Sequence, residues 1–402
     1  MKSDQPGRVT GSLVCGLTAL IIGALGLKYR MNTSPYVNTS DADGNSSGNF
    51  SMEEPVWDDI IQAYSYNRAD QLVISIFMPM VVIIGIFGNV MTVIVIVKHL
   101  RTAVNVYLAN LAITDTLYLL LAPDLIWISY LKSSVHDLYD IGSGILWFCR
   151  LNIYIVDTTL QVAIFTIFWM SVERYMAICH PFQFRKKGFG KRLRSIQLCC
   201  IMWLVALVWQ ARSFAWITEV SFQLPWPDMY NGIPNSTSVC VYCHFNSGKN
   251  CDIQNHLFDV DIFLSLIFVF VIIGMYTAIF VTLKKSHFTS ANSTGTSLRF
   301  KSEKKVLQTV FLTVTIYIIL MAPFRCLNIF NSYYDIHKFI LQTVNIFRVA
   351  NYLNSSVNPI IYNAVNEDFR KAFLDVFCCC NSKPIPEIRR AVPAITLNLN
   401  PV

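Results

Sequence analysis

Hydrophobic residues in this chain form seven long runs separated by short polar stretches. The runs lie at residues 71–97, 104–130, 145–178, 196–217, 256–283, 304–333 and 338–364. Each is long enough for the ~20 residues that an α-helix needs to cross ~30 Å of hydrocarbon. The pattern predicts an all-α membrane protein with a seven-transmembrane helix bundle over residues 71–364.

The seventh run is the most polar of the set. It carries Gln342, Asn345, Arg348, Asn351, Asn354 and Asn358. Polar groups at membrane depth are tolerated only where they face protein or water inside a bundle. We therefore expect function to concentrate along this segment.

Charge in the short loops predicts the orientation. Basic residues gather on one side, at Lys98, Arg101, 185–194, 284–285 and 301–305, which indicates the cytoplasm. The other side carries acidic residues and the glycosylation sequons at Asn32, Asn38, Asn45, Asn49 and Asn235. We expect a multi-pass plasma-membrane protein with a glycosylated extracellular tail at residues 1–70.

Both ends of the chain carry features of their own. An apolar run at 12–27 is flanked by basic residues, so a cleaved signal peptide and an extra uncleaved helix both stay open. Residues 365–377 are predicted to form a short amphipathic helix on the membrane surface. Cys378, Cys379 and Cys380 follow it and indicate palmitoylation, at the start of a cytoplasmic tail over 378–402.

Composition excludes several classes of protein. Apolar residues make up 54% of the 402 positions and charged residues 14%, which is too little polarity to cover two or three soluble domains. The net charge of +7 falls in short runs between apolar stretches, so no nucleic-acid partner is expected. No catalytic triad order, phosphate loop or metal-ligand spacing occurs in a soluble segment, and no repeat typical of transporters is found. Neither an enzyme nor a transporter is expected.

Five motifs in a fixed order carry a family resemblance. They are Asn89, Asn110-Leu111-Ala112-Ile113-Thr114-Asp115, Glu173-Arg174-Tyr175, Trp203 and Asn358-Pro359-Ile360-Ile361-Tyr362. With them the chain resembles the rhodopsin-like (class A) G-protein-coupled receptors over about residues 70–380. One departure lies in the sixth segment, where Leu320-Met321-Ala322-Pro323 lacks the family's usual tryptophan.

The resemblance implies roles at the cytoplasmic end. Arg174, between Glu173 and Tyr175, would meet a heterotrimeric G protein, and Glu303 would hold Arg174 at rest. A solvated ion pair of little consequence is the alternative for Glu303. Tyr276 and Tyr362 would bring their hydroxyls together on activation, and Pro359, beside Asn358, would supply a pivot.

In the membrane centre, the resemblance implies a polar network around Asp115. Asn89, Asn354, Ser355 and Asn358 would surround it together with water and a sodium ion, the one ion expected in this protein. A polar cluster that only fixes helix packing is the alternative, because the same residues would serve that purpose equally well.

The ligand expected is an extracellular peptide. Val156 stands where amine receptors carry an aspartate, and a long second extracellular loop with Trp226 suits broad contact. Pro323-Phe324-Arg325 and the run from Arg348 to Ser355 resemble receptors of the thyrotropin-releasing-hormone type. That resemblance implies ligand-binding residues at Arg325, Arg348, Asp157, Phe324, Asn328 and Tyr352. Asp157 either meets a cationic ligand group or balances the arginines.

Arrestin, a receptor kinase and membrane lipid are the further partners expected. A class A receptor for a non-peptide ligand and a decoy that binds without signalling are the alternative functions. Four cysteines fall on the outer side, which is an oxidising compartment where thiols pair. Cys149–Cys240 with Cys243–Cys251, and Cys149–Cys243 with Cys240–Cys251, both remain open.

Overall fold

The computed structural model describes residues 55–100, 102–132, 135, 146–223, 226–228, 230, 231, 233, 235–241, 249–289, 308, 311–321, 323 and 337–377. Several predictions fall outside these residues. They concern the run at 12–27, the sequons Asn32, Asn38, Asn45 and Asn49, the cysteines Cys378, Cys379 and Cys380, and the tail over 378–402.

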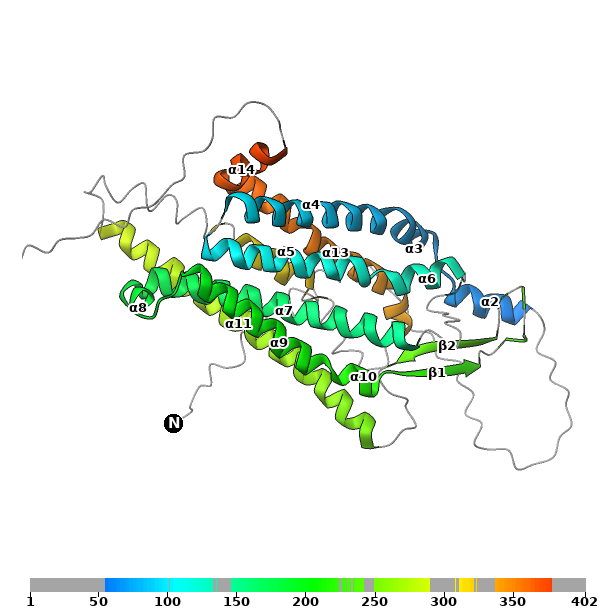
Figure 1. Ribbon diagram of the computed structural model, residues 1–402. Coiled ribbons are helices and arrows are strands. Elements are labelled where there is room, and N and C mark those ends of the chain that lie inside the picture. Colours follow the sequence, from blue (N-terminus) through cyan, green and yellow to red (C-terminus); the bar gives the residue numbers. More distant parts are fainter. Residues whose placement is uncertain are drawn as a thin grey trace, which may run out of the picture.

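Long helices run side by side in one bundle (Figure 1). They are α4 (Met78–His99), α5 (Ala103–Leu121), α7 (Leu146–Cys179), α9 (Arg192–Gln210), α11 (Lys249–Thr289) and α13 (His337–Val365). The short helix α3 (Arg68–Leu72) and the π-helical turn Val73–Phe77 lead directly into α4. Helix α5 is central, because it packs against α4, α7, α9 and α13.

Five of the described helices are long and apolar enough to cross a membrane. They are Arg68–His99, Ala103–Leu131, Trp147–Cys179, Arg192–Phe214 and Phe263–Leu283. A shorter apolar helix, Phe311–Met321, lies in the sixth predicted segment. Helix α13 has the length but is not among the five, in line with the polar residues along it. These segments match the predicted bundle.

The two ends of the bundle differ (Figure 1). One end holds α8 (Pro181–Lys186) and α14 (Glu367–Phe377), and we call it the α14 end. The other holds α2 (Pro55–Tyr64), α6 (Asp124–Lys132), α10 (Arg212–Trp216) and the strands β1 (Thr218–Gln223) and β2 (Ser236–Val241). We call this one the hairpin end, because β1 and β2 pair antiparallel, Thr218 opposite Val241. The sequence did not predict this hairpin.

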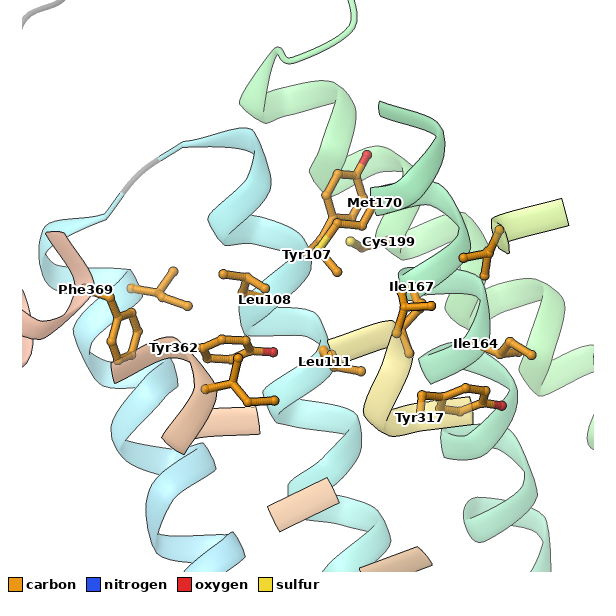
Figure 2. Close-up of a cluster of buried hydrophobic side chains, with 14 of the residues drawn as sticks. Tyr107, Leu108, Leu111, Ile164, Ile167, Met170, Cys199, Tyr317, Tyr362 and Phe369 are labelled. Atoms are coloured by element: carbon orange, nitrogen blue, oxygen red, sulfur yellow. The ribbon is translucent and has the colours of Figure 1, made fainter. Parts of the chain in front are cut away.

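The bundle buries polar and apolar groups together and leaves apolar groups outside. Figure 2 shows Tyr107, Leu111, Met170 and Tyr362 within one buried cluster. Ile83, Phe87, Leu204 and Val208 lie exposed on the outer face, whereas Asn89 and Asp115 are buried. This arrangement is typical of a protein whose outer solvent is lipid.

A proline divides the second membrane segment into α5 and α6. Pro123 has no N–H to donate and its ring does not fit a regular helix, so the helix breaks here and carbonyl groups at the end of α5 need other partners. Asn152 of α7 donates to the Leu121 carbonyl at 2.9 Å, and the Tyr352 hydroxyl of α13 donates to the Ala122 carbonyl at 3.3 Å. The break is therefore fixed by side chains from two other helices.

A small apolar cluster joins α2 to the loops of the hairpin end. Ile61, Val135 and Trp226 are buried together, and Ser65 forms a β-bridge with Val135. Asn231 donates to Asp58 at 3.0 Å on the rim of the cluster. The chain ahead of the first membrane helix thus packs on the loops.

We predict that Gly85→Ala destabilises the bundle. A Cβ at Gly85 would lie 2.6 Å from Leu119 Cδ1 and 2.8 Å from Ser356 Cβ. Ser356 has no freedom to move, since its hydroxyl donates to the Tyr352 carbonyl at 2.7 Å and lies 3.0 Å from the Val81 carbonyl. Overpacking of this kind costs about 1–3 kcal/mol, so the melting temperature of the purified protein should fall.

Gly274→Ala is the matched control. Beyond the backbone of its own helix, no atom of the described residues lies within 4 Å of a Cβ built there, and alanine favours a helix over glycine by about 1 kcal/mol. Equal melting temperatures for Gly85→Ala and the wild type would contradict the close approach of α4 and α13.

Candidate functional site

A buried polar cluster joins α4, α5 and α13 in the middle of the bundle. Asn358 Nδ2 donates to Asp115 Oδ2 at 2.8 Å, and Asn89 Nδ2 donates to the Ser355 carbonyl at 2.8 Å. All four residues are at most 4% exposed. The structure thus brings together four of the five residues assigned to the Asp115 network.

Asn354 is the fifth member, and it lies half-buried with no hydrogen bond to the cluster among the described side chains. Asn89 Oδ1 is a buried acceptor with no hydrogen-bond partner among the described residues. An oxygen of this kind in the same polar cluster as the Asp115 carboxylate suits a hard cation, which takes oxygen ligands. The residues present therefore fit a sodium ion or a water molecule.

The motif residues Asn110 and Trp203 meet as well. Trp203 Nε1 donates to Asn110 Oδ1 at 2.9 Å, and Asn110 Nδ2 donates to the Thr166 hydroxyl at 2.7 Å. These bonds tie α5 to α7 and α9. The two residues were recognised from the sequence, but their contact was not.

The Glu173-Arg174-Tyr175 motif lies in the last turns of α7, at the α14 end of the bundle. Glu173 is only 2% exposed and accepts a hydrogen bond from the Tyr107 hydroxyl at 3.0 Å. Tyr175 bonds to His180 Nε2 at 3.2 Å. Tyr107 was missed in the sequence, because a tyrosine inside a helix is more often only part of the core. Glu303 lies outside the described residues.

Tyr276 and Tyr362 are both buried, and neither hydroxyl has a hydrogen-bond partner among the described residues. The Tyr276 ring packs against Phe311 and the Tyr362 ring against Phe369. The structure therefore does not join the two hydroxyls. A buried hydroxyl without a partner has free energy to gain from a rearrangement that supplies one.

At the hairpin end, Arg348 belongs to a hydrogen-bonded chain. Arg348 Nη1 donates to Asn345 Oδ1 at 3.3 Å, and Asn345 Nδ2 donates to Asp70 Oδ1 at 3.0 Å. Asn345 and Asp70 are buried, whereas Arg348 is half-buried. Asp70 was missed as a site residue, although Asn345 stood out by its polarity within the seventh run.

The other predicted ligand residues are placed only in part. Tyr352 lies one turn from Arg348 and is buried, and Asp157 is half-buried on α7. Phe324, Arg325 and Asn328 lie outside the described residues.

A second ionic contact at the hairpin end was not predicted. Arg212 of α10 forms an ion pair with Asp261 of α11, which also accepts from Trp209 Nε1 at 2.7 Å. The Arg212 guanidinium lies 4.8 Å from the centre of the Trp209 ring. Both charges are largely shielded from solvent, so this contact holds the outer ends of the fourth and fifth segments together.

The helices and these clusters define a multi-pass membrane protein with a polar middle and a charged motif at one end. The family of 7 transmembrane receptors (rhodopsin family) matches residues 88–362, and this chain belongs to that family.

Peptide-hormone receptors are among its relatives. Neuromedin-U receptor 2 of Rattus norvegicus is 28% identical over 323 residues, covering 77% of this chain and 76% of that receptor. Somatostatin receptor type 4 of Rattus norvegicus is 25% identical over 337 residues, covering 80% and 78%. The thyrotropin-releasing hormone receptor of Bos taurus is 25% identical over 352 residues, covering 78% and 80%. The predicted resemblance is confirmed, and it extends to several peptide receptors at similar distance.

The disulfide partners remain a prediction. Cys149 is buried and disulfide-bonded, and Cys240 lies on β2 opposite Glu219. Side chains of Cys240, Cys243 and Cys251 lie outside the described part. We expect Cys149–Cys240 with Cys243–Cys251, or the exchanged pairs, because extracellular thiols pair in an oxidising compartment. Peptide mapping under non-reducing conditions decides between them, and a free thiol at Cys149 would contradict both.

Proposed function

We propose that this chain is a plasma-membrane receptor that binds an extracellular peptide and activates an intracellular heterotrimeric G protein. The observation that carries the proposal is the intact Glu173-Arg174-Tyr175 motif with its glutamate buried at the α14 end of a rhodopsin-family bundle. A carboxylate kept from water there is stable only while its partners stay in place. Separation of the helices would therefore change the state of the motif.

The α14 end faces the cytoplasm in this proposal. Basic residues at this end support it, because cytoplasmic loops carry an excess of Lys and Arg. They are Lys98, Arg185, Lys186, Lys187, Lys191 and Arg192. The N-terminal tail and half-buried Asn235 then lie outside, where the sequons would be glycosylated.

A peptide is the ligand class that the hairpin end suits best. The relatives above carry the names of peptide hormones. The hairpin, α2 and their buried cluster add protein mass beyond the helices, and a peptide needs such breadth of contact. Arrestin, a receptor kinase and palmitoylation at Cys378, Cys379 and Cys380 belong to the same proposal at the α14 end.

The proposal is tested by a screen for G-protein activation and calcium release in cells that display the chain. Neuromedin U, somatostatin, thyrotropin-releasing hormone and further amidated neuropeptides are the probes. We expect a concentration-dependent response to at least one peptide. A peptide that binds at the cell surface without any G-protein response would favour the decoy function instead.

A sodium ion near Asp115 is the second part of the proposal. Asp115, Asn89 and Ser355 would hold it, and the ion would supply the positive charge that a buried carboxylate needs. The purified protein should then unfold at a higher temperature in sodium chloride than in choline chloride of equal ionic strength. Asp115→Asn should remove the difference, and Thr116→Val should keep it. A sodium effect that persists in Asp115→Asn would exclude this site.

Arg174→Ala is predicted to keep peptide binding and abolish G-protein activation. Arg174 lies at the α14 end, whereas the ligand residues lie at the hairpin end, so the substitution separates the two functions. The exposed Arg192→Ala at the same end is the control for loss of a basic charge. Second-messenger output from Arg174→Ala equal to that of the wild type, at equal surface expression, would refute the role of the motif.

Arg348→Ala and Arg325→Ala are each predicted to weaken peptide potency by about 2–5 kcal/mol, because a ligand acceptor loses its charged donor. Arg68→Ala is the control, since Arg68 is exposed at the start of α3.

Asp157→Asn then separates the two roles for the aspartate. A loss confined to peptides with Lys or Arg indicates direct contact, and an equal change for all peptides indicates charge balance. Wild-type potency of both arginine variants would contradict the assignment of Arg325 and Arg348 as ligand-binding residues.

A further inference from the structure

Tyr107 occupies the junction of three helices at the α14 end. Its side chain is 0% exposed and lies beside Met170 of α7 and Cys199 of α9 (Figure 2). The hydroxyl donates to Glu173 Oε1 at 3.0 Å. A hydrogen bond from α5 thus reaches the motif that ends α7.

The loop after α8 meets the same carboxylate from another side. The Gly190 backbone contributes a favourable electrostatic interaction with Glu173. Gly190 has φ +77, and a Cβ there would lie 2.8 Å from Phe184 Cζ. Phe184 stacks on Phe189 at 5.9 Å, and the Arg194 guanidinium lies 4.2 Å from the centre of the Phe189 ring. The positive φ of Gly190 and the packing of Phe184, Phe189 and Arg194 fix the conformation of this loop.

We propose that Tyr107 is a positioning residue that holds Glu173 in the resting state of the receptor. The inference rests on the proposed function. A charged acceptor buried at 2% exposure needs its donors, and it gains water in their place once the helices part. The Tyr107 hydrogen bond therefore stabilises the closed arrangement more than the open one, and its loss shifts the population toward the open state.

Tyr107→Phe removes the hydroxyl and keeps the ring. We expect ligand-independent G-protein activation, measured at equal surface expression, to rise at least roughly tenfold, since one hydrogen bond to a charged group is lost from one state. Tyr154→Phe is the matched control. Its hydroxyl donates to the Leu207 carbonyl at 3.2 Å, far along α7 from the motif, so ligand-independent activation should stay at the wild-type level.

A double-variant cycle separates positioning from general loss of stability. In a Glu173→Ala background the hydrogen-bond acceptor is absent, so Tyr107→Phe should add little to the signal of that background. Independent, additive effects of the two substitutions would overturn the proposal, because a merely structural tyrosine does not act through Glu173.

A second measurement does not depend on a G protein. Cys179 Sγ lies 3.4 Å from Thr282 Oγ1, between α7 and α11 at the α14 end. Parting of these helices should speed maleimide labelling of Cys179, measured by peptide mass spectrometry on the purified protein. Faster labelling of Cys179 in the Tyr107→Phe variant, without any G-protein signal, would support the Tyr107 contact and contradict the proposed function. Unchanged labelling together with unchanged ligand-independent activation would overturn the inference.

Discussion

Lipid offers no hydrogen bonds, and the positions of the buried polar groups in this bundle follow from that constraint. Asn358 bonds to Asp115, Asn89 reaches the Ser355 carbonyl, and the Ser356 hydroxyl lies between the Val81 and Tyr352 carbonyls. These contacts join α4, α5 and α13 across the membrane centre. The motif residues by which the family is recognised are therefore also residues that hold the helices together.

The same constraint links the proline break to α13 near the hairpin end. The Leu121 and Ala122 carbonyls at the break accept hydrogen bonds from Asn152 on α7 and Tyr352 on α13. Tyr352 lies one turn from Arg348, so a movement of this part of α13 would disturb a partner of the α5 backbone. Under the proposed function, this contact would offer an inward route for the signal that does not need the tryptophan that the sixth segment lacks.

The sequence predicted the helices and the motifs because both depend on local information. Apolar length defines the membrane segments, and the order of short motifs identifies the family. Which side chains form hydrogen bonds with one another depends on packing between distant segments. Asn345 and Asp70, for example, lie 275 positions apart. Tyr107 gave no signal, because an aromatic ring suits a buried helix face whether or not its hydroxyl has a partner. Strands β1 and β2 were missed because they lie in a long loop, and the prediction for that loop rested on its cysteines.

Asp70 changes the charge balance around Arg348 at the hairpin end. The charged ligand residues of the proposal, Arg325, Arg348 and Asp157, would alone carry a net positive charge that attracts carbonyl and carboxylate groups alike. Asn345 connects the Arg348 guanidinium to a buried carboxylate, and the attraction of opposite charges is strong where water is scarce. Part of the guanidinium charge is thereby balanced inside the protein. A ligand group opposite Arg348, as proposed, would meet this partly balanced charge, which favours a neutral carbonyl because a carboxylate would bear the larger desolvation cost.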